Sequence, residues 1–266
     1  MRPATITLTT DFGVSDHYVG VMKGVIASIN PQATVIDINH EVRPFNVAQG
    51  AFFVAQAYRY FPAATVHIAV VDPGVGTSRK PILVEAAGQR FVAPDNGLLS
   101  QIYEREPHTV RAIDAERFAL KPTSLTFHGR DIFAPVGAWL STGKESADFG
   151  EIVTKYVRLQ TTASEMLEPG HWRGRILNID RFGNLITSFP AALLQQPWTA
   201  IQITAGQLQI YSVHTAYASA KPGEPFAIAG SSDLLELSVN EGSAADAADA
   251  EIGDTVELIL ARPDEV

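Results

Sequence analysis

Short β-type runs alternate along the first 140 residues with segments whose apolar positions recur every three or four residues. Thr5–Thr10 and Thr34–Ile38 are rich in β-branched residues, and Thr65–Val71 is very apolar, as is typical of a strand buried on both faces. Helical spacing predicts helices within residues 19–29, 52–59 and 131–140, and further strands are predicted at Ile82–Glu85 and Arg90–Val92. This rhythm predicts an α/β domain over residues 1–150, with a mostly parallel sheet and helices on both faces.

The pattern changes after residue 150. Residues 151–172 lose all periodicity and carry Gly, Ser, Glu and Pro, so we expect a linker there. Residues 173–266 contain short alternating runs and no helical spacing, which predicts a small all-β, barrel-like C-terminal domain. Its expected strands are Arg175–Ile179, Leu185–Ser188, Ala200–Ile203, Leu208–Tyr211, Pro225–Ala229, Leu234–Val239 and Thr255–Leu260.

The composition of the chain excludes several classes of function. The 266 residues are 46% hydrophobic and carry a net charge of -9, so we expect a folded protein that binds neither nucleic acid nor an anionic membrane. The chain has no cysteine, which excludes disulfides, thiolate zinc sites and cysteine nucleophiles, and its seven histidines are too scattered for a dedicated metal site. No window approaches the ~20 apolar residues of a membrane span. We expect a cytoplasmic protein without metal or cofactor.

Candidate chemistry lies where predicted strands end, because ligands of parallel sheets bind at the carboxyl ends of the strands. Asp11 directly follows the first strand, and Asp72 follows the most apolar one. Pro73, Gly74 and Gly76 shape a turn that can bring Asp72 to Arg79, and His128 stands where a helix begins. Each residue also has a plain structural interpretation: a turn for Asp11, a salt bridge for Asp72 and Arg79, and packing for His128.

The sequence lacks two familiar nucleotide-binding motifs. The stretch from Gly137 to Lys144 has the wrong glycine spacing for a phosphate-binding loop and ends a predicted helix instead of beginning one. Pro73–Gly76 lacks the third glycine of a dinucleotide fingerprint. In the second half, the segments around Asp180, Ser231 and Asn240 each look like an ordinary turn when taken alone.

Taken in order along the chain, these segments resemble one family, the SAM hydroxide adenosyltransferases, which are relatives of the fluorinase and chlorinase enzymes. The segments are Thr9–Gly13, Val71–Gly76, Arg79, Pro94–Gly97, Phe127–Asp131, Phe182–Asn184 and Asn240–Ala244. The resemblance covers nearly the whole chain. It implies a homotrimer in which S-adenosyl-L-methionine (SAM) binds between the N-terminal domain of one subunit and the C-terminal domain of the next.

The resemblance also implies roles for individual residues. Asp11 would hold the ribose diol and Phe45 would pack against the ligand. The other binding residues lie in the C-terminal domain: Asp180, Phe182 and Asn184 for the methionine and adenine parts, Ser231 for the methionine end, and Asn240, Glu241 and Ala244 for adenine. The spacing around Asp180 is one residue shorter than in the fluorinase.

The expected reaction is hydrolysis of SAM to adenosine and L-methionine by in-line displacement at C5′ of the ribose. Arg79 would stabilise developing hydroxide, and either His128 or Asp72 would take the proton, while Asp72 orients Arg79. Two alternatives stay open. A halogenase of the same fold would use a halide in place of water, although Asp72 would repel that anion. A non-catalytic regulator would bind SAM or adenosine without turnover.

Overall fold

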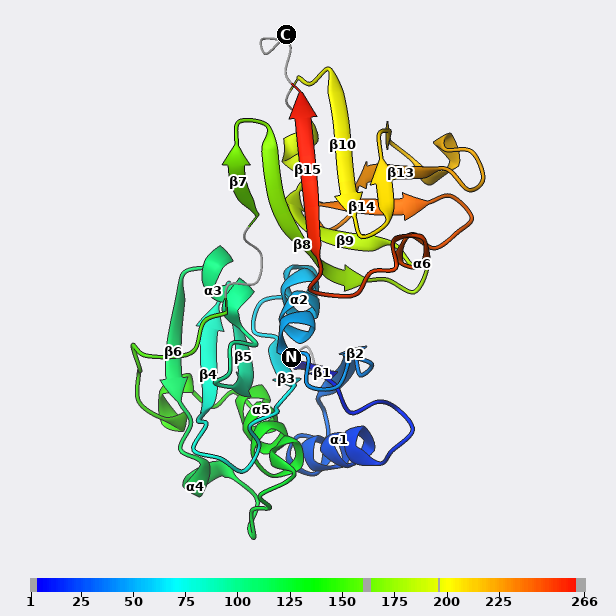
Figure 1. Cartoon of the computed structure of the whole chain (residues 1–266). Helices are drawn as coiled ribbons and strands as arrows, with labels where there is room; N and C mark the ends of the chain where they lie inside the picture. Colours follow the sequence, from blue (N-terminus) through cyan, green and yellow to red (C-terminus); the bar gives the residue numbers. More distant parts are fainter. Residues whose placement is uncertain (1–3, 160–163, 196, 262–266) are drawn as a thin grey trace. The chain divides into compact units, whose positions relative to one another are not determined.

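The computed structural model describes residues 4–159, 164–195 and 197–261 (Figure 1). The chain divides into two compact units, Met1–Leu159 and Gln160–Val266, which are described separately. Within the range expected to be a linker, strand β7 spans Glu165–Glu168 and β8 begins at His171.

The first unit is built on a six-stranded sheet with the order β2-β1-β3-β5-β4-β6. Its strands are β1 (Thr5–Thr10), β2 (Thr34–Asn39), β3 (Val66–Val70), β4 (Pro81–Ala86), β5 (Gln89–Pro94) and β6 (His108–Ala112). The strands β2, β1, β3 and β5 run parallel, whereas β4 is antiparallel to both β5 and β6. The sheet is therefore mixed, and the expectation of a mostly parallel sheet was wrong.

The reason lies in the connection between β4 and β5. Only Ala87 and Gly88 join them, and both have positive φ, 52° and 71°. A two-residue turn of this kind makes an antiparallel hairpin, because a parallel neighbour needs a crossover of about a dozen residues. The sequence carried this signal in the short spacing between the two predicted strands.

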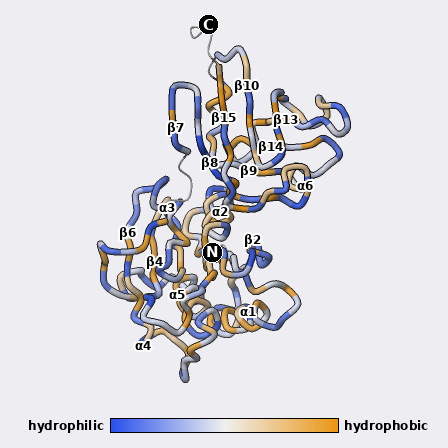
Figure 2. Tube along the Cα trace, in the orientation of Figure 1, coloured by the Kyte–Doolittle hydropathy of each residue, from blue (hydrophilic) through white to orange (hydrophobic). Residues whose placement is uncertain are grey.

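Alternate side chains of β3, and that of Val71 directly after it, belong to two hydrophobic cores, one on each face of the sheet. Val66, Ile68 and Val70 pack against α1 and α5, whereas Ala69 and Val71 pack against α2 and α3. The apolar run of β4 stands out in Figure 2. The helices of this unit are α1 (Tyr18–Ile29), α2 (Val47–Ala57), α3 (Ser100–Arg105), α4 (Ala115–Phe118) and α5 (Ala134–Ser141), with 3-10 turns at Tyr58–Tyr60 and Ser146–Phe149 and a π-turn at Gly129–Phe133.

The second unit is one curled nine-stranded sheet with the path β11-β10-β15-β8-β9-β14-β13-β12, to which β7 adds beside β8. Its other strands are β8 (His171–Ile179), β9 (Leu185–Pro190), β10 (Ala200–Ala205), β11 (Leu208–Ile210), β12 (Val213–His214), β13 (Pro225–Ala229), β14 (Leu234–Val239) and β15 (Thr255–Ala261), with 3-10 turns at Ala191–Gln195 and Tyr217–Ser219. The first half of β8 pairs with β15 and its second half with β9. Because both halves of the sheet share β8, they bend around one core.

Seven of these strands match those expected, but the unit is not purely β. The alanine-rich tract after Ser243, expected to be a solvated loop, forms α6 (Ala244–Ala248). Ser243 caps this helix by accepting a hydrogen bond from the Asp246 N–H, and Ala244 and Ala248 are buried in the core. In the described ranges of both units, no helix has the length and apolar character that crossing a bilayer requires.

Gly137 explains why a glycine stands inside α5. A Cβ built there would lie 2.4 Å from Cδ1 of Ile68 and 2.7 Å from its Cγ1, so the helix backbone rests directly on β3. Gly137, which does not belong to a phosphate-binding loop, is therefore a packing residue. Core packing at this density tolerates added methyl groups poorly.

We expect Gly137→Ala to lower the free energy of unfolding by about 1–3 kcal/mol through overpacking, in spite of alanine's better helix propensity. Urea unfolding followed by circular dichroism measures the change. Gly24→Ala in α1 is the matched control, because nothing lies within 4 Å of its added Cβ. That control is expected to gain up to ~1 kcal/mol. A Gly137→Ala protein as stable as the control variant would contradict the close helix–strand packing.

Candidate active site

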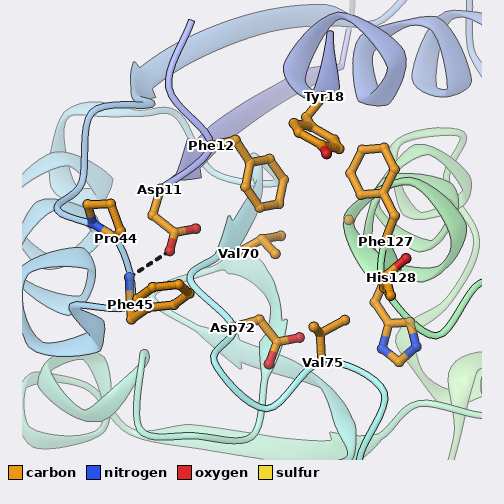
Figure 3. Close-up of a pocket in the computed structure, with 12 residues that line it drawn as sticks. Asp11, Phe12, Tyr18, Pro44, Phe45, Val70, Asp72, Val75, Phe127 and His128 are labelled. Atoms are coloured by element: carbon orange, nitrogen blue, oxygen red, sulfur yellow. Dashed lines mark hydrogen bonds between the residues drawn. The ribbon is translucent and has the colours of Figure 1, made fainter. Parts of the chain in front are cut away.

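A pocket of about 410 Å³ opens at the carboxyl ends of β1 and β3. Asp11 and Phe12 enter it from the end of β1, Asp72 from the end of β3, and Pro44 and Phe45 from the loop after β2. Figure 3 shows Asp11 and Phe45 on one side of the space and Phe127 and His128 on the other, with Asp72 between them. This is the position expected for ligand binding in a sheet with parallel central strands.

Asp72, Arg79 and His128 form one hydrogen-bonded cluster. Arg79 Nε donates to Asp72 Oδ1 over 3.1 Å, and Arg79 Nη2 donates both to Asp72 Oδ2 and, over 2.9 Å, to His128 Nδ1. The Arg79 and Asp72 side chains are only 7% and 5% exposed. The structure thus brings together the three residues predicted to be catalytic. A salt bridge is present, as the structural interpretation expected, but it lies in contact with a histidine at a pocket.

The six-residue loop between Asp72 and Arg79 folds back by consecutive turns. The Val75 N–H donates to the Asp72 carbonyl, and the Thr77 N–H and hydroxyl both donate to the Gly74 carbonyl. Gly76 has φ +77°, and a Cβ there would lie 2.4 Å from the Leu125 carbonyl oxygen. This contact packs the loop against the segment that leads to His128.

The hydrogen bond from Arg79 decides the state of His128. Burial lowers the pKa of the His128 imidazole below its ordinary value, and the positive charge of Arg79 lowers it further. A guanidinium can only donate, so Nδ1 of His128 accepts and the proton of the neutral ring is on Nε2. In this arrangement His128 offers its surroundings an N–H donor.

One donor of Arg79 is left over. Its Nη1 is buried and has no hydrogen-bond partner within the described parts of the chain. A buried guanidinium donor without a partner costs free energy unless a ligand or water meets it. The geometry therefore leaves one guanidinium donor of the cluster without an acceptor among the described residues.

Asp11 is held against the loop after β2. Its Oδ2 accepts the Phe45 N–H over 2.9 Å, and Phe45 has the left-handed backbone of φ 67° (Figure 3). Burial raises the pKa of Asp11 and the charge of Asp72 acts in the same direction, although the Phe45 hydrogen bond lowers it. Phe45 stays 71% exposed at the pocket, so its ring is available to pack against a ligand.

An aromatic wall closes the pocket, and the sequence indicated it only in part. The rings of Phe12, Tyr18 and Phe127 contact one another at centroid distances of 4.9–5.9 Å. Gly129 fits among them, because a Cβ there would lie 3.1 Å from both Phe12 and Phe127. Phe12 and Phe127 stand beside the predicted Asp11 and His128, whereas nothing in the sequence marks Tyr18.

The neighbouring Arg130 and Asp131 have a structural role. Asp131 is buried and accepts hydrogen bonds from the Arg130 guanidinium and from the Ser124 N–H, which ties down the loop before His128. The Arg130 guanidinium also lies over the Phe127 ring at 5.3 Å. The pair thus supports both Phe127 and His128.

The second unit has its own pocket, of about 610 Å³. Asp180, Phe182, Asn184, Asn240 and Glu241 line it, so the structure brings these five predicted residues together. The Asp180 carboxylate is already occupied within the turn. It accepts from the Phe182 and Asn184 N–H groups over 2.9 Å each and from Asn184 Nδ2 over 2.8 Å. Asp180 therefore shapes the turn, and Phe182 stays 77% exposed beside it.

Two predicted residues do not join this lining. Ser231 lies in the turn before β14, whereas Asn240 and Glu241 follow its end, about six residues or ~20 Å of strand away. Ala244 is buried in the core at the start of α6. The sequence missed Tyr217, which lines the pocket and donates to the buried Glu236 over 2.8 Å. Burial raises the pKa of Tyr217 to about 12.

No group of three or more His, Asp or Glu side chains suited to a metal ion occurs in residues 4–159, 164–195 and 197–261.

Comparison with known proteins gives matches to both units. The profile of the SAM hydroxide adenosyltransferase N-terminal domain matches residues 6–150, and that of the C-terminal domain matches residues 174–257. Relatives named (R)-S-adenosyl-L-methionine hydrolase are 36–44% identical to this chain. The one from Salinispora arenicola is 38% identical, over 91% of this chain and 92% of its own.

A more distant relative and a solved structure also match this chain over most of its length. A fluorinase from an Actinoplanes species is 28% identical, over 69% of this chain and 70% of its own. The crystal structure of an uncharacterized conserved protein from Thermotoga maritima matches with a TM-score of 0.89 at 37% identity. The match covers 96% of this chain and 99% of that one.

The contact between Arg79 and His128 predicts a titration result. Arg79→Gln removes the positive charge beside the imidazole, so we expect the pKa of His128 to rise, which an NMR titration of its ring signals measures. Lys23→Gln is the matched control. It also removes one positive charge, but from an exposed ion pair with Asp37. Its His128 pKa is expected to equal that of the wild type. An unchanged His128 pKa in Arg79→Gln would refute the electrostatic contact.

Proposed function

This chain belongs to the SAM hydroxide adenosyltransferase family, and we propose that it hydrolyses SAM to adenosine and L-methionine. The observation that carries the proposal is the Asp72–Arg79–His128 cluster at the edge of the first-unit pocket. Asp72 and His128 line the pocket, and Arg79 connects them. No cofactor is needed, because the leaving group of SAM is already activated.

The charges and surfaces of the pocket suit SAM. Its sulfonium is a cation, and the pocket presents the carboxylates of Asp11 and Asp72. Asp11 keeps Oδ1 beside the oxygen that accepts the Phe45 N–H, so it can accept hydrogen bonds from the ribose hydroxyls. Phe45 packs against the ligand, and the wall of Phe12, Tyr18 and Phe127 gives the site its apolar side.

The reaction is a displacement in one step. The oxygen of water forms a bond to C5′ while the C5′–S bond breaks, and the electron pair of that bond stays on sulfur. Methionine leaves as a neutral thioether, so no general acid is required. Water loses a proton as it attacks, and the difficulty is this loss, because bulk water has a pKa of about 15.7.

The Asp72–Arg79–His128 cluster makes this proton loss easier through the positive charge of Arg79 and the hydrogen-bond donors of the cluster. The positive charge of Arg79, whose Nη1 has no partner in the described residues, stabilises the negative charge that develops on the attacking oxygen. His128, neutral with its proton on Nε2, orients the water as a second donor. The carboxylate of Asp72 fixes the guanidinium in this position. Proton acceptance by His128 would require Nδ1 to leave Arg79, so Asp72 or solvent is the better acceptor in this geometry.

Water is favoured over halide as the nucleophile. A halide about 4 Å from a carboxylate meets a repulsion of about 4 kcal/mol at an effective dielectric of 20, and Asp72 lines this pocket. Arg79 offsets part of this repulsion, whereas a neutral water molecule meets none of it. A non-catalytic regulator would have no need of such a cluster.

We further propose a cytoplasmic homotrimer in which the second-unit pocket of one subunit completes the site of the next. Each unit carries half of the chemistry that SAM requires. The first unit has the ribose and nucleophile residues, and the second has Phe182, Asn184 and the turn at Asn240. Phe182 is an exposed ring on a turn that Asp180 holds rigid, which suits packing against adenine. Ser231 and the backbone of Ala244 remain proposed contacts of the methionine and adenine parts.

Purified protein supplied with SAM is expected to release adenosine and methionine in equal amounts, with or without chloride. We expect Asp72→Ala, Arg79→Ala and His128→Ala each to lower kcat by about 10²–10⁴-fold, because each removes a group that acts on the water. SAM affinity, measured by calorimetry, is expected to change only a few-fold. Arg111→Ala is the matched control, because Arg111 pairs with Glu85 away from the pocket.

Three results would count against this assignment. Wild-type rates in all three variants would remove the cluster from the mechanism. A chlorinated nucleoside that appears only with chloride would identify a halogenase. Tight SAM binding with no methionine after hours would identify the regulator.

The shared site predicts complementation between inactive subunits. Asp72→Ala inactivates the first unit, and Phe182→Asp places a charge where adenine would pack. Coexpressed in equal amounts, the two variants are expected to recover about one quarter of wild-type activity, because one interface in four joins two intact halves in a random ring. If the site lay within one subunit, no mixed oligomer would be active.

A further inference from the structure

The segment Pro94–Gly97 belongs to the ordered set of motifs, yet it does not line the pocket. It begins at the last residue of β5 and lies at the same edge of the sheet as the loop of Asp72. Asn96 reaches across to that loop, where its Nδ2 donates to the Val71 carbonyl oxygen over 2.8 Å. Asn96 thus holds the peptide group that joins Val71 to Asp72.

This peptide lies beyond the end of the β-ladder. The last residue pairs of β3 are Thr10↔Val70 with β1 and Ile68↔Val92 with β5. Val71 is fully buried, and a buried carbonyl oxygen without a donor costs about 1–3 kcal/mol. The Asn96 amide therefore continues the sheet's hydrogen bonding by one residue, up to the start of the catalytic loop.

Asn96 is itself fixed in orientation. The Leu98 N–H donates to its Oδ1 over 3.2 Å, so the amide oxygen faces Leu98 and the NH₂ group faces Val71. The Val71 side chain is confined as well, because Gly50 leaves it so little room that a Cβ on Gly50 would lie 2.9 Å from Val71 Cγ2. Val71 is held by packing on one side and by Asn96 on the other.

We propose that Asn96 is a positioning residue, which fixes the main chain at Asp72 so that this carboxylate holds Arg79 against His128. The inference rests on the proposed SAM hydrolysis. A shift of about 1 Å in a catalytic group can cost on the order of 10²-fold in rate without loss of binding. Asn96 acts through Asp72 alone, and the ligand-contacting Asp11 and Phe45 belong to other loops.

Asp95, its neighbour, provides the matched control. Its Oδ1 accepts the Val157 N–H over 2.8 Å and so ties down the last residues of the first unit, away from the Asp72 loop. Asp95 and Asn96 therefore stand side by side in one motif, each with one side-chain hydrogen bond to a distant segment. Only the side-chain bond of Asn96 leads to the cluster, because the other contact of Asp95, from its main-chain N–H to the Lys80 carbonyl oxygen, does not depend on the carboxylate.

The test compares Asn96→Asp, Asn96→Ala and Asp95→Ala in the full-length protein, with SAM as substrate. Asn96→Asp keeps the shape but loses the donor, and Asn96→Ala carries the test should the added charge prevent folding. Both are expected to lower kcat by about 10- to 100-fold while KM and the adenosine dissociation constant stay within about 2-fold. Asp95→Ala is expected to lower the melting temperature and leave kcat unchanged.

The outcomes are separable. A wild-type protein that does not cleave SAM overturns the proposed function itself. If the wild type is active and the folded Asn96 variants keep its kcat, the positioning role is overturned. Equal losses of kcat in the Asn96 and Asp95 variants would also overturn it, because the motif would then act only through general stability.

Discussion

The buried ion pair between Asp72 and Arg79 is the constraint on which the site depends. Removing two charges from water costs several kcal/mol per ion, and this cost is offset only by close geometry and further hydrogen bonds. The structure supplies both, because the guanidinium bonds Asp72 through two nitrogens and reaches His128 with one of them. The turns of the loop, the glycine at position 76 and the carbonyl held by Asn96 all serve to keep this pair in place.

The sequence predicted the local part of this arrangement better than the distant part. Asp72 and Arg79 share one loop with turn-forming residues, so their pairing followed from chain geometry. The position of His128 beside Arg79 depends on the contact between the Leu125 carbonyl and Gly76. These two residues are about fifty positions apart, so the spacing of residues along the chain does not predict their contact. Only the family resemblance predicted it. Tyr18 was missed for the same reason, because its ring meets Phe12 and Phe127 through the tertiary fold alone.

The errors in the fold also have physical causes. Alternating strands and helices predicted the parallel half of the sheet, but the two residues between β4 and β5 force an antiparallel hairpin. In the second unit, the alanine-rich tract after Ser243 was expected to be a solvated loop, but it forms α6, because Ser243 caps a helix there. Short polar motifs predicted turns well, but not which side chains each turn exposes.

The charge balance of the cluster connects its structure to the proposed reaction. With His128 neutral, the charges of Asp72 and Arg79 cancel, and the carboxylate of Asp11 gives the pocket a negative charge that suits a cationic substrate such as SAM. As water attacks, negative charge grows on its oxygen while the positive charge on sulfur disappears. An imidazolium at position 128 would add a cation that repels the bound substrate before the reaction begins. The burial and the neighbouring guanidinium that lower the pKa of His128 therefore favour both substrate binding and the approach of a water molecule to C5′.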